Sequence, residues 1–301
     1  MASRATAGTG TARIRATRGQ GRTVRRWLRR NRNAVRLAGA LAVLVIMLFP
    51  VYWMVISGLK TQHDLFAAPP SFYPAHPVWS RIGDAIRTYG RPLLNSIAIS
   101  AIATVITALV CVPGAYALAK LGVSQRITSV LLVVILVVQV LPTIMLVSPL
   151  YEIAIRLHVL NQFWTIGLLD SMYSVPFGLL VLRAYMVALP DALREAALVD
   201  GCSEPKVFLR VILPNCRPGV ATVVIFAFLF AWGDFVFGLN FTNGPAVQPA
   251  TVSLYEIIGQ NVQPWGQLMA LGTVLAVPAV VVVLIAQRAL QQGVAGFGID
   301  K

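Results

Sequence analysis

Residues 190–218 read PDALREAALVDGCSEPKVFLRVILPNCRP and form the longest polar interruption in the second half of a mostly apolar chain. The pattern predicts two short helices. The first covers about residues 191–199 and ends at Gly201, because glycine readily adopts the left-handed conformation found after many helix C-termini. Ser203 is expected to cap the second helix. Pro214 is expected to stop it, because proline lacks the amide hydrogen that a helix needs.

The second predicted helix has an apolar face. Val207 and Val211 lie one turn apart, and so do Phe208 and Ile212. Apolar runs of membrane-spanning length flank the whole stretch on both sides. Two amphipathic helices joined at a glycine are typical of a docking surface, whereas a simple linker needs no such face.

The composition indicates a membrane protein. Of the 301 residues, 57% are hydrophobic and 12% charged, and the mean hydropathy is +0.74. These values override the expectation of two soluble domains that the length alone would suggest. In a soluble protein, the net charge of +14 would suggest binding to nucleic acid. In a membrane protein, the Lys and Arg residues must first be assigned to the loops on each side of the membrane.

Six apolar segments approach or exceed the roughly 20 residues needed to cross the hydrocarbon layer. They cover about residues 37–57, 96–118, 127–150, 163–186, 219–239 and 268–286. They predict an all-α, polytopic membrane protein with six transmembrane helices. The expected organisation is a basic N-terminal tail (1–36), a six-helix membrane domain (37–290) and a short C-terminal tail (291–301).

The basic residues predict the orientation. Residues 1–36 contain eleven arginines and no acid, and residues 1–22 lack an apolar period, which predicts disorder. A twin-arginine export signal and an organelle transit peptide are alternatives, but the following apolar run is too long for an export signal and lacks a small-residue cleavage site. With the N-terminus inside, the inner side holds 20 of the 25 Lys and Arg residues. The positive-inside rule therefore predicts that both termini and the stretch 190–218 are cytoplasmic.

The residues that carry chemistry form no catalytic pattern. Cys111 lies within an apolar segment, and Cys202 and Cys216 fall on the expected inner side, far from the histidines on the outer side. This arrangement predicts neither a disulfide nor a metal site. There is also no glycine-rich phosphate loop. The sequence thus predicts no catalytic residue, no metal ligand and no cofactor bound by this chain.

Two acids, Asp170 and Asp234, lie within apolar segments, where ionisable groups are functional candidates by default. One interpretation is that they line a polar cavity open to the outside. The other is that they are solvated at the interface or hydrogen-bonded to a neighbouring helix.

The spacing within residues 190–218 resembles the EAA loop, which marks the membrane subunits of binding-protein-dependent ABC importers. Residues 190–218 are accordingly called the EAA loop. The family usually has Ile where this chain has Val211. The residues that the resemblance implicates in coupling to an ATPase are Glu195, Ala196, Ala197, Asp200, Gly201, Val211, Leu213 and Pro214.

Other motifs extend this resemblance over about residues 43–296, to the smaller, six-helix permease of the maltose type. They are Asn95-Ser96, Ala115-Tyr116-Ala117 with Lys120, Leu141-Pro142, Pro149-Leu150-Tyr151, and the run from Phe230 to Phe235. The last run contains Trp232, which joins Asp170 and Asp234 as a candidate for lining a translocation pathway. Gly233 departs from the Asn that the family often has at this position.

The resemblance implies a non-catalytic permease subunit of a bacterial plasma membrane, forming half of a pathway for a sugar or oligosaccharide. The implied partners are a second homologous permease, two ATP-binding subunits that use the ATP, and an extracytoplasmic solute-binding protein. No nucleic acid is expected. The alternatives are a permease of the same type for glycerol phosphate or a peptide, a secondary transporter driven by an ion gradient, and a structural membrane adaptor.

Overall fold

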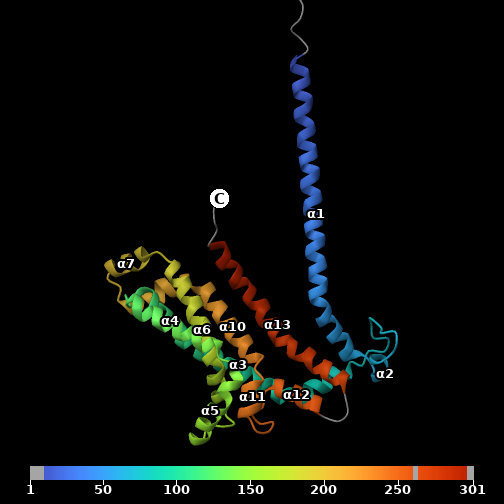
Figure 1. The fold of residues 1–301 in the computed structure, drawn as a ribbon, viewed down its shortest axis with the longest axis vertical. Coiled ribbons are helices and arrows are strands. Elements are labelled where there is room, and N and C mark those ends of the chain that lie inside the picture. Colours follow the sequence, from blue (N-terminus) through green and yellow to red (C-terminus); the bar gives the residue numbers. More distant parts are fainter. Residues whose placement is uncertain (1–9, 260–263, 297–301) are drawn as a thin grey trace, which may run out of the picture. The chain divides into compact units, whose positions relative to one another are not determined.

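The computed structural model describes residues 10–259 and 264–296, with side chains for 34–259 and 264–287. Every regular element in these residues is a helix, as the apolar segments predict (Figure 1). The chain divides at Val55 into two compact units, which are described separately.

The first unit consists of helix α1 (Gly10–Leu59), whose last turn enters the second unit. Its apolar part, Ala34–Leu59, is long enough to cross a membrane. Residues 10–22 were predicted to be disordered, but in the structure they are helical. Ala and Arg are good helix formers, and the helix contains no proline before Pro50. Residues 1–9, which share the prediction of disorder, lie outside the described residues.

Three further helices are long and apolar enough to span a membrane: α3 (Ser80–Lys120), α6 (Phe163–Ala188) and the part of α13 (Trp265–Gly296) that ends at Gln287. Helix α3 is longer than expected. It begins at Ser80, well before the second apolar segment (about residues 96–118), and continues through that segment.

Two predicted spans are bent. Helices α4 (Gln125–Val140) and α5 (Thr143–Arg156) meet at 97°, with Pro142 at the break. The helical residues 204–215 meet α10 (Arg217–Trp232) at 78°. The described residues therefore contain four continuous candidate spans, or up to six if each bent pair is one span. Length and hydropathy predicted the segments, but the bends depend on local breaks in the backbone hydrogen bonds.

Short helices complete the second unit. The fifth apolar segment ends earlier than expected, because α10 stops at Trp232 and a separate helix, α11, follows. The short helices away from the EAA loop are α2 (Gln62–Leu65), α11 (Val236–Phe241) and α12 (Ala250–Gly259).

Helices α3, α6 and α10 form the tightest part of the second unit, because glycines let them approach closely. A Cβ atom at Gly178 would lie 2.7 Å from Cys111 Sγ on α3 and 2.8 Å from Val223 Cγ1 on α10. A Cβ atom at Gly167 would lie 2.7 Å from Ile102 Cγ2. The EAA loop projects from this three-helix core.

Candidate coupling site

The first helix of the EAA loop, α7, runs from Asp191 to Val199, as predicted. Gly201 follows with φ of 82°, in the left-handed region. Its amide donates to the Leu198 carbonyl at 3.0 Å, and the Cys202 amide donates to the Ala197 carbonyl at 3.0 Å. These two bonds form the Schellman motif that closes many helices. The predicted role of Gly201 at the end of the helix is confirmed.

The second helix consists of α8 (Glu204–Val207), a π-helical turn η1 (Phe208–Ile212) and α9 (Leu213–Asn215). Two details differ from the prediction. Ser203 stands at the N-cap position, but its side chain makes no capping hydrogen bond, and its carbonyl accepts from the amides of Lys206 and Val207 instead. Pro214 lies inside the helix rather than stopping it, because the wider π-turn before it accommodates a missing amide donor.

The predicted apolar face of the second helix packs into the core. Val207 and Ile212 are fully buried, and Phe208 and Val211 are half-buried beside them. They contact a cluster built from α3, α6 and α10. Its buried members are Cys111, Ala115, Tyr116, Leu182, Met186, Cys216 and Val223. The loop is therefore a packed extension of the core.

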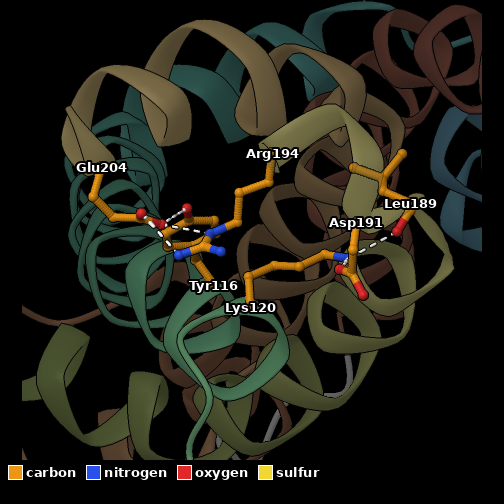
Figure 2. Close-up of polar contacts among 6 residues, drawn as sticks. All are labelled: Tyr116, Lys120, Leu189, Asp191, Arg194 and Glu204. Carbon is orange, nitrogen blue, oxygen red and sulfur yellow. Dashed lines mark hydrogen bonds and ion pairs between the residues drawn. The ribbon is translucent and has the colours of Figure 1, made fainter. Parts of the chain in front are cut away.

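An ion pair joins the two helices of the loop (Figure 2). Arg194 on α7 binds both carboxylate oxygens of Glu204 on α8, at 2.8 Å from Nε and 2.9 Å from a terminal nitrogen. Tyr116 of α3 also donates its hydroxyl to Glu204, and its ring packs on Phe208 with centroids 4.7 Å apart. A two-pronged, charge-assisted contact of this kind restricts geometry more than a single bond does. The loop helices are held to each other and to α3.

A second contact ties α3 to the start of the loop. The Lys120 ammonium donates to the Leu189 carbonyl at 2.7 Å and to Asp191 Oδ1 at 2.5 Å. The Lys120 side chain is only 3% exposed, although Asp191 is open to solvent. The hydrogen bond from Lys120 lowers the pKa of Asp191 below its usual value, so this carboxylate stays charged at neutral pH.

The solvent-exposed side chains of the loop are both charged and apolar. Glu195 is exposed and forms no salt bridge with any residue that the structure describes. Val199 is 86% exposed and Leu209 is 58% exposed. Leu209 also borders a groove of about 460 Å³ whose other lining residues are Leu213, Pro214, Arg217, Val220, Ala221 and Val224. Val199 lies one helical turn from Glu195 on α7. Exposed apolar side chains of this kind, close to a charged one, are typical of a surface that binds another protein.

Asp170 and Asp234 differ in their surroundings. Asp170 is fully buried on α6, and neither carboxylate oxygen has a hydrogen-bond partner among the described residues. Asp234 precedes α11, and its carboxylate accepts from the amides of Phe237 at 3.3 Å and Gly238 at 2.9 Å. Asp234 therefore caps a helix, which accounts for its presence. Asp170 has no such structural explanation.

Trp232 is the last residue of α10, and its buried side chain packs against α13. Its indole nitrogen donates to the Leu275 carbonyl at 3.2 Å, and its ring stacks on Phe228 with centroids 5.8 Å apart. These contacts give Trp232 a packing role.

Comparison with known protein families identifies the family of this chain. A profile described as the binding-protein-dependent transport system inner membrane component matches residues 112–296 of this chain. The chain belongs to this family. It is a multi-pass permease subunit of a bacterial inner membrane, and the match includes the whole EAA loop.

Individual relatives match over most of the permease. The sulfoquinovosyl glycerol transport system permease protein SmoH of Agrobacterium fabrum is 32% identical, over 88% of this chain and 93% of that protein. The trehalose transport system permease protein SugB of Mycobacterium tuberculosis is 31% identical, over 82% of this chain and 90% of that protein.

Solved structures share the fold of the permease. A chain of a bacterial ABC transporter involved in import of the acidic polysaccharide alginate matches with a TM-score of 0.71. It is 18% identical, and the match covers 94% of this chain and 99% of that chain. A chain of the alginate transporter in complex with a pentasaccharide-bound periplasmic protein matches with a TM-score of 0.61 at 15% identity, over 87% of this chain and 93% of that chain.

Sequence reasoning missed the contacts that hold the loop of this permease in place. Arg194 and Glu204 were visible only as charges within the loop, and Tyr116 and Lys120 only as parts of a family-like motif. The ten-residue spacing of Arg194 and Glu204 across a helix end was the one available signal. It does not predict a bond, because the angle between the two helices was unknown.

Proposed function

We propose that this permease forms half of a pathway for a sugar or oligosaccharide and is driven by ATPase subunits that dock on the EAA loop. The solvent-exposed side chains of the loop support this most directly. They include Glu195 and Val199 on α7, and Leu209 on the second helix, which borders the groove. The complex contains a second, homologous permease, two ATP-binding subunits and an extracytoplasmic solute-binding protein. This chain binds no cofactor, and the partner subunits use the ATP.

Coupling then follows from the way the loop is built. ATP-driven closure of the ATPase subunits moves the loop, and the loop moves the helices into which its apolar face is packed. The proposed docking residues include Glu195, Ala196, Ala197 and Asp200, while Gly201 sets the angle between the loop helices. Val211, Leu213 and Pro214 belong to the second helix, which anchors the loop.

The names of the relatives support a carbohydrate as the solute. The SmoH and SugB names specify a sulfoquinovosyl glycerol and trehalose, and a third relative, DasC of Streptomyces coelicolor, is named for diacetylchitobiose uptake. All three solutes contain sugar units. The exact sugar is expected to be selected mainly by the solute-binding protein.

Reconstitution tests this proposal. The complex is purified through this chain, its binding protein is identified, and ATP hydrolysis is measured in proteoliposomes with and without the sugar that this protein binds. We expect co-purified ATPase subunits and sugar-stimulated hydrolysis. Stimulation by glycerol phosphate or a peptide instead would assign the solute to another class. Uptake that persists in ATP-depleted cells would favour a carrier driven by an ion gradient.

The topology gives a separate prediction. We expect an impermeant maleimide to label Cys202, which is half-buried, in inverted membrane vesicles but not from outside intact cells, because basic residues concentrate on the side of the EAA loop. Cys216 is buried and serves as an unreactive internal control. Efficient labelling of Cys202 from outside would contradict the orientation with cytoplasmic termini.

Replacing the two intramembrane acids gives a further prediction. We expect Asp170→Asn to change uptake with membrane insertion and ATPase co-purification unaltered, because the buried carboxylate has no structural partner in the described residues. Asp234→Asn is expected to have a smaller effect on uptake, since the asparagine oxygen can still accept one of the two amide hydrogen bonds that cap α11. Asp84→Asn, at an exposed position, is the matched control. Normal uptake by both variants would assign the two acids to structural roles.

A further inference from the structure

We propose that helix α3 connects the EAA loop to the segment 245–250 beyond the far end of the membrane domain, so that both move together during the transport cycle. The connection is made by two pairs of positioning residues on this helix, Tyr116 with Lys120 and Asn95 with Ser96. The inference rests on the proposed function, because it assumes that ATPase subunits move the loop.

At one end, α3 holds both helices of the loop by side chains. Tyr116 binds Glu204, which also pairs with Arg194, and Lys120 binds Asp191 and the Leu189 carbonyl (Figure 2). Tyr116 and the Lys120 side chain are only 4% and 3% exposed. The bonds from Tyr116 to Glu204 and from Lys120 to the Leu189 carbonyl are partly buried, whereas Asp191 is open to solvent. The two partly buried bonds are costly to break, because water replaces the lost partners less readily there.

At the other end, α3 holds the segment 245–250 in the same way. The Asn95 amide nitrogen donates to the Pro245 carbonyl at 3.2 Å and to the Gln248 carbonyl at 2.9 Å. The Ser96 hydroxyl accepts from the Ala250 amide at 2.9 Å. Both side chains are 2% exposed. Three hydrogen bonds therefore tie a stretch without regular structure, and the first residue of α12, to one helix.

Helix α3 is suited to carry motion between these ends. It is one helix from Ser80 to Lys120, although Pro113, between the two ends, lacks the amide hydrogen of a helix bond. At 1.5 Å per residue, the distance along the helix from Ser96 to Tyr116 is about 30 Å, close to the thickness of the hydrocarbon layer. Neighbouring α6 packs so closely that a Cβ atom on Gly167 would lie 3.2 Å from the Ala103 amide. A Cβ atom on Gly114, next to Pro113, would lie 2.9 Å from Leu179 Cδ2 of α6. This close packing supports α3 at the proline, where the helix would bend most easily.

The covalent connections of the loop are weaker mechanical links. Between α6 and α7 the chain passes through Leu189 and Pro190, which have extended ψ angles of 134° and 135°. Between the second loop helix and α10 the chain bends by 78° at Cys216. Both joints are places where a helix ends, so the side-chain contacts with α3 provide the stiffer route. This assigns a role to two motifs, Asn95-Ser96 and Ala115-Tyr116-Ala117 with Lys120, that docking of the ATPase does not require.

The test places a reporter on the far segment of the complete complex. Ala246 is exposed, so Ala246→Cys is introduced together with Cys202→Ser, which leaves the buried Cys111 and Cys216. The complex is reconstituted in proteoliposomes, and the rate of maleimide labelling is compared without nucleotide and with ATP and vanadate. We expect a severalfold difference between the two rates. Equal rates in a complex that hydrolyses ATP would overturn the proposal.

Variants at the two ends then test the connection. Tyr116→Phe combined with Lys120→Met is expected to retain ATP hydrolysis but to bring the ratio of rates close to one. Asn95→Ala combined with Ser96→Ala removes all three hydrogen bonds to segment 245–250. This second double variant is also expected to bring the ratio of rates close to one, and it changes no residue that contacts the EAA loop. Thr104→Val is the matched control, because this hydroxyl bonds only within α3, to the Ser100 carbonyl at 2.7 Å.

The outcomes separate the two proposals. If the unchanged chain recruits no ATPase subunits, the proposed function fails. If the complex with Asn95→Ala and Ser96→Ala hydrolyses ATP and keeps the full difference in rates, α3 is not the connection. This holds even if the variant with Tyr116→Phe and Lys120→Met fails to assemble. If Thr104→Val also abolishes the difference between the two labelling rates, any change on α3 has this effect. That result would show that the contacts at the two ends of α3 have no specific role.

Discussion

Uptake is expected to collapse in both Glu195→Lys and Gly201→Asp, with the protein still inserted in the membrane. Glu195 is exposed on α7 and available to pair with a basic residue of an ATPase subunit. Once such a pair is desolvated in the complex, reversing one charge costs several kcal/mol, because two like charges then face each other.

Gly201→Asp is expected to fail for a different reason. Nothing lies within 4 Å of a Cβ atom at Gly201, so a side chain fits sterically. The backbone φ of 82° is the obstacle, since a residue with a side chain costs roughly 1 kcal/mol or more in this conformation. Relief of that strain would change the angle between the two loop helices and would weaken the Arg194–Glu204 pair.

The measurements are co-purification of the ATPase subunits and ligand-stimulated ATP hydrolysis in reconstituted complex, alongside uptake. Gly122→Asp is the control for backbone strain, because Gly122 also has positive φ, 69°, with open space around it. Asp84→Lys is the control for charge reversal at an exposed acid outside the loop. Full docking, full stimulation and normal uptake in both loop variants would show that this loop does not couple ATP hydrolysis to transport.

Gly178→Leu is expected to lower the thermal stability of the detergent-purified protein sharply, or to prevent its accumulation. The first atom of the new side chain would already overlap Cys111 on α3 and Val223 on α10. Both neighbours are buried and have little room to move. Overpacking of a well-packed core typically costs about 1–3 kcal/mol, and a leucine at this junction adds three more carbon atoms beyond Cβ.

The control for this prediction is Gly83→Leu on α3, where nothing lies within 4 Å of a Cβ atom. Both variants place a leucine within a helix, so helix propensity favours them equally. We expect a midpoint of thermal unfolding near that of the unchanged protein for Gly83→Leu and a clearly lower one for Gly178→Leu. Equal midpoints would mean that α3, α6 and α10 do not meet at Gly178.

Local sequence signals determined the elements of this permease. Hydropathy over roughly 20 residues predicts a helix, because backbone groups in lipid must be bonded within the segment. The same holds for the EAA loop. The spacing of Val207 with Val211 and of Phe208 with Ile212 predicted an apolar face, and these residues pack into the core. Gly201 adopts the left-handed conformation that ends α7, as predicted for a glycine. Each of these signals operates within a few turns of chain, so no partner segment was needed to interpret it.

The bends were less predictable. Pro142 breaks one predicted span, whereas Pro50 and Pro113 lie inside continuous helices, although all three prolines lack the same hydrogen bond. Neighbouring helices and local geometry decide whether the freed carbonyl is satisfied, and these are properties of packing. For the same reason Pro214 did not stop its helix.

Only the tertiary structure decided which polar groups meet. Tyr116 and Glu204 are 88 residues apart, and Asn95 and Gln248 are 153 apart. Hydropathy places each of these residues on a helix or in a loop, but it does not specify the rotation of one helix against another. Close packing at Gly167 and Gly178 sets the position of α3 against α6, and that position brings the two ends of α3 within hydrogen-bonding distance of their partners.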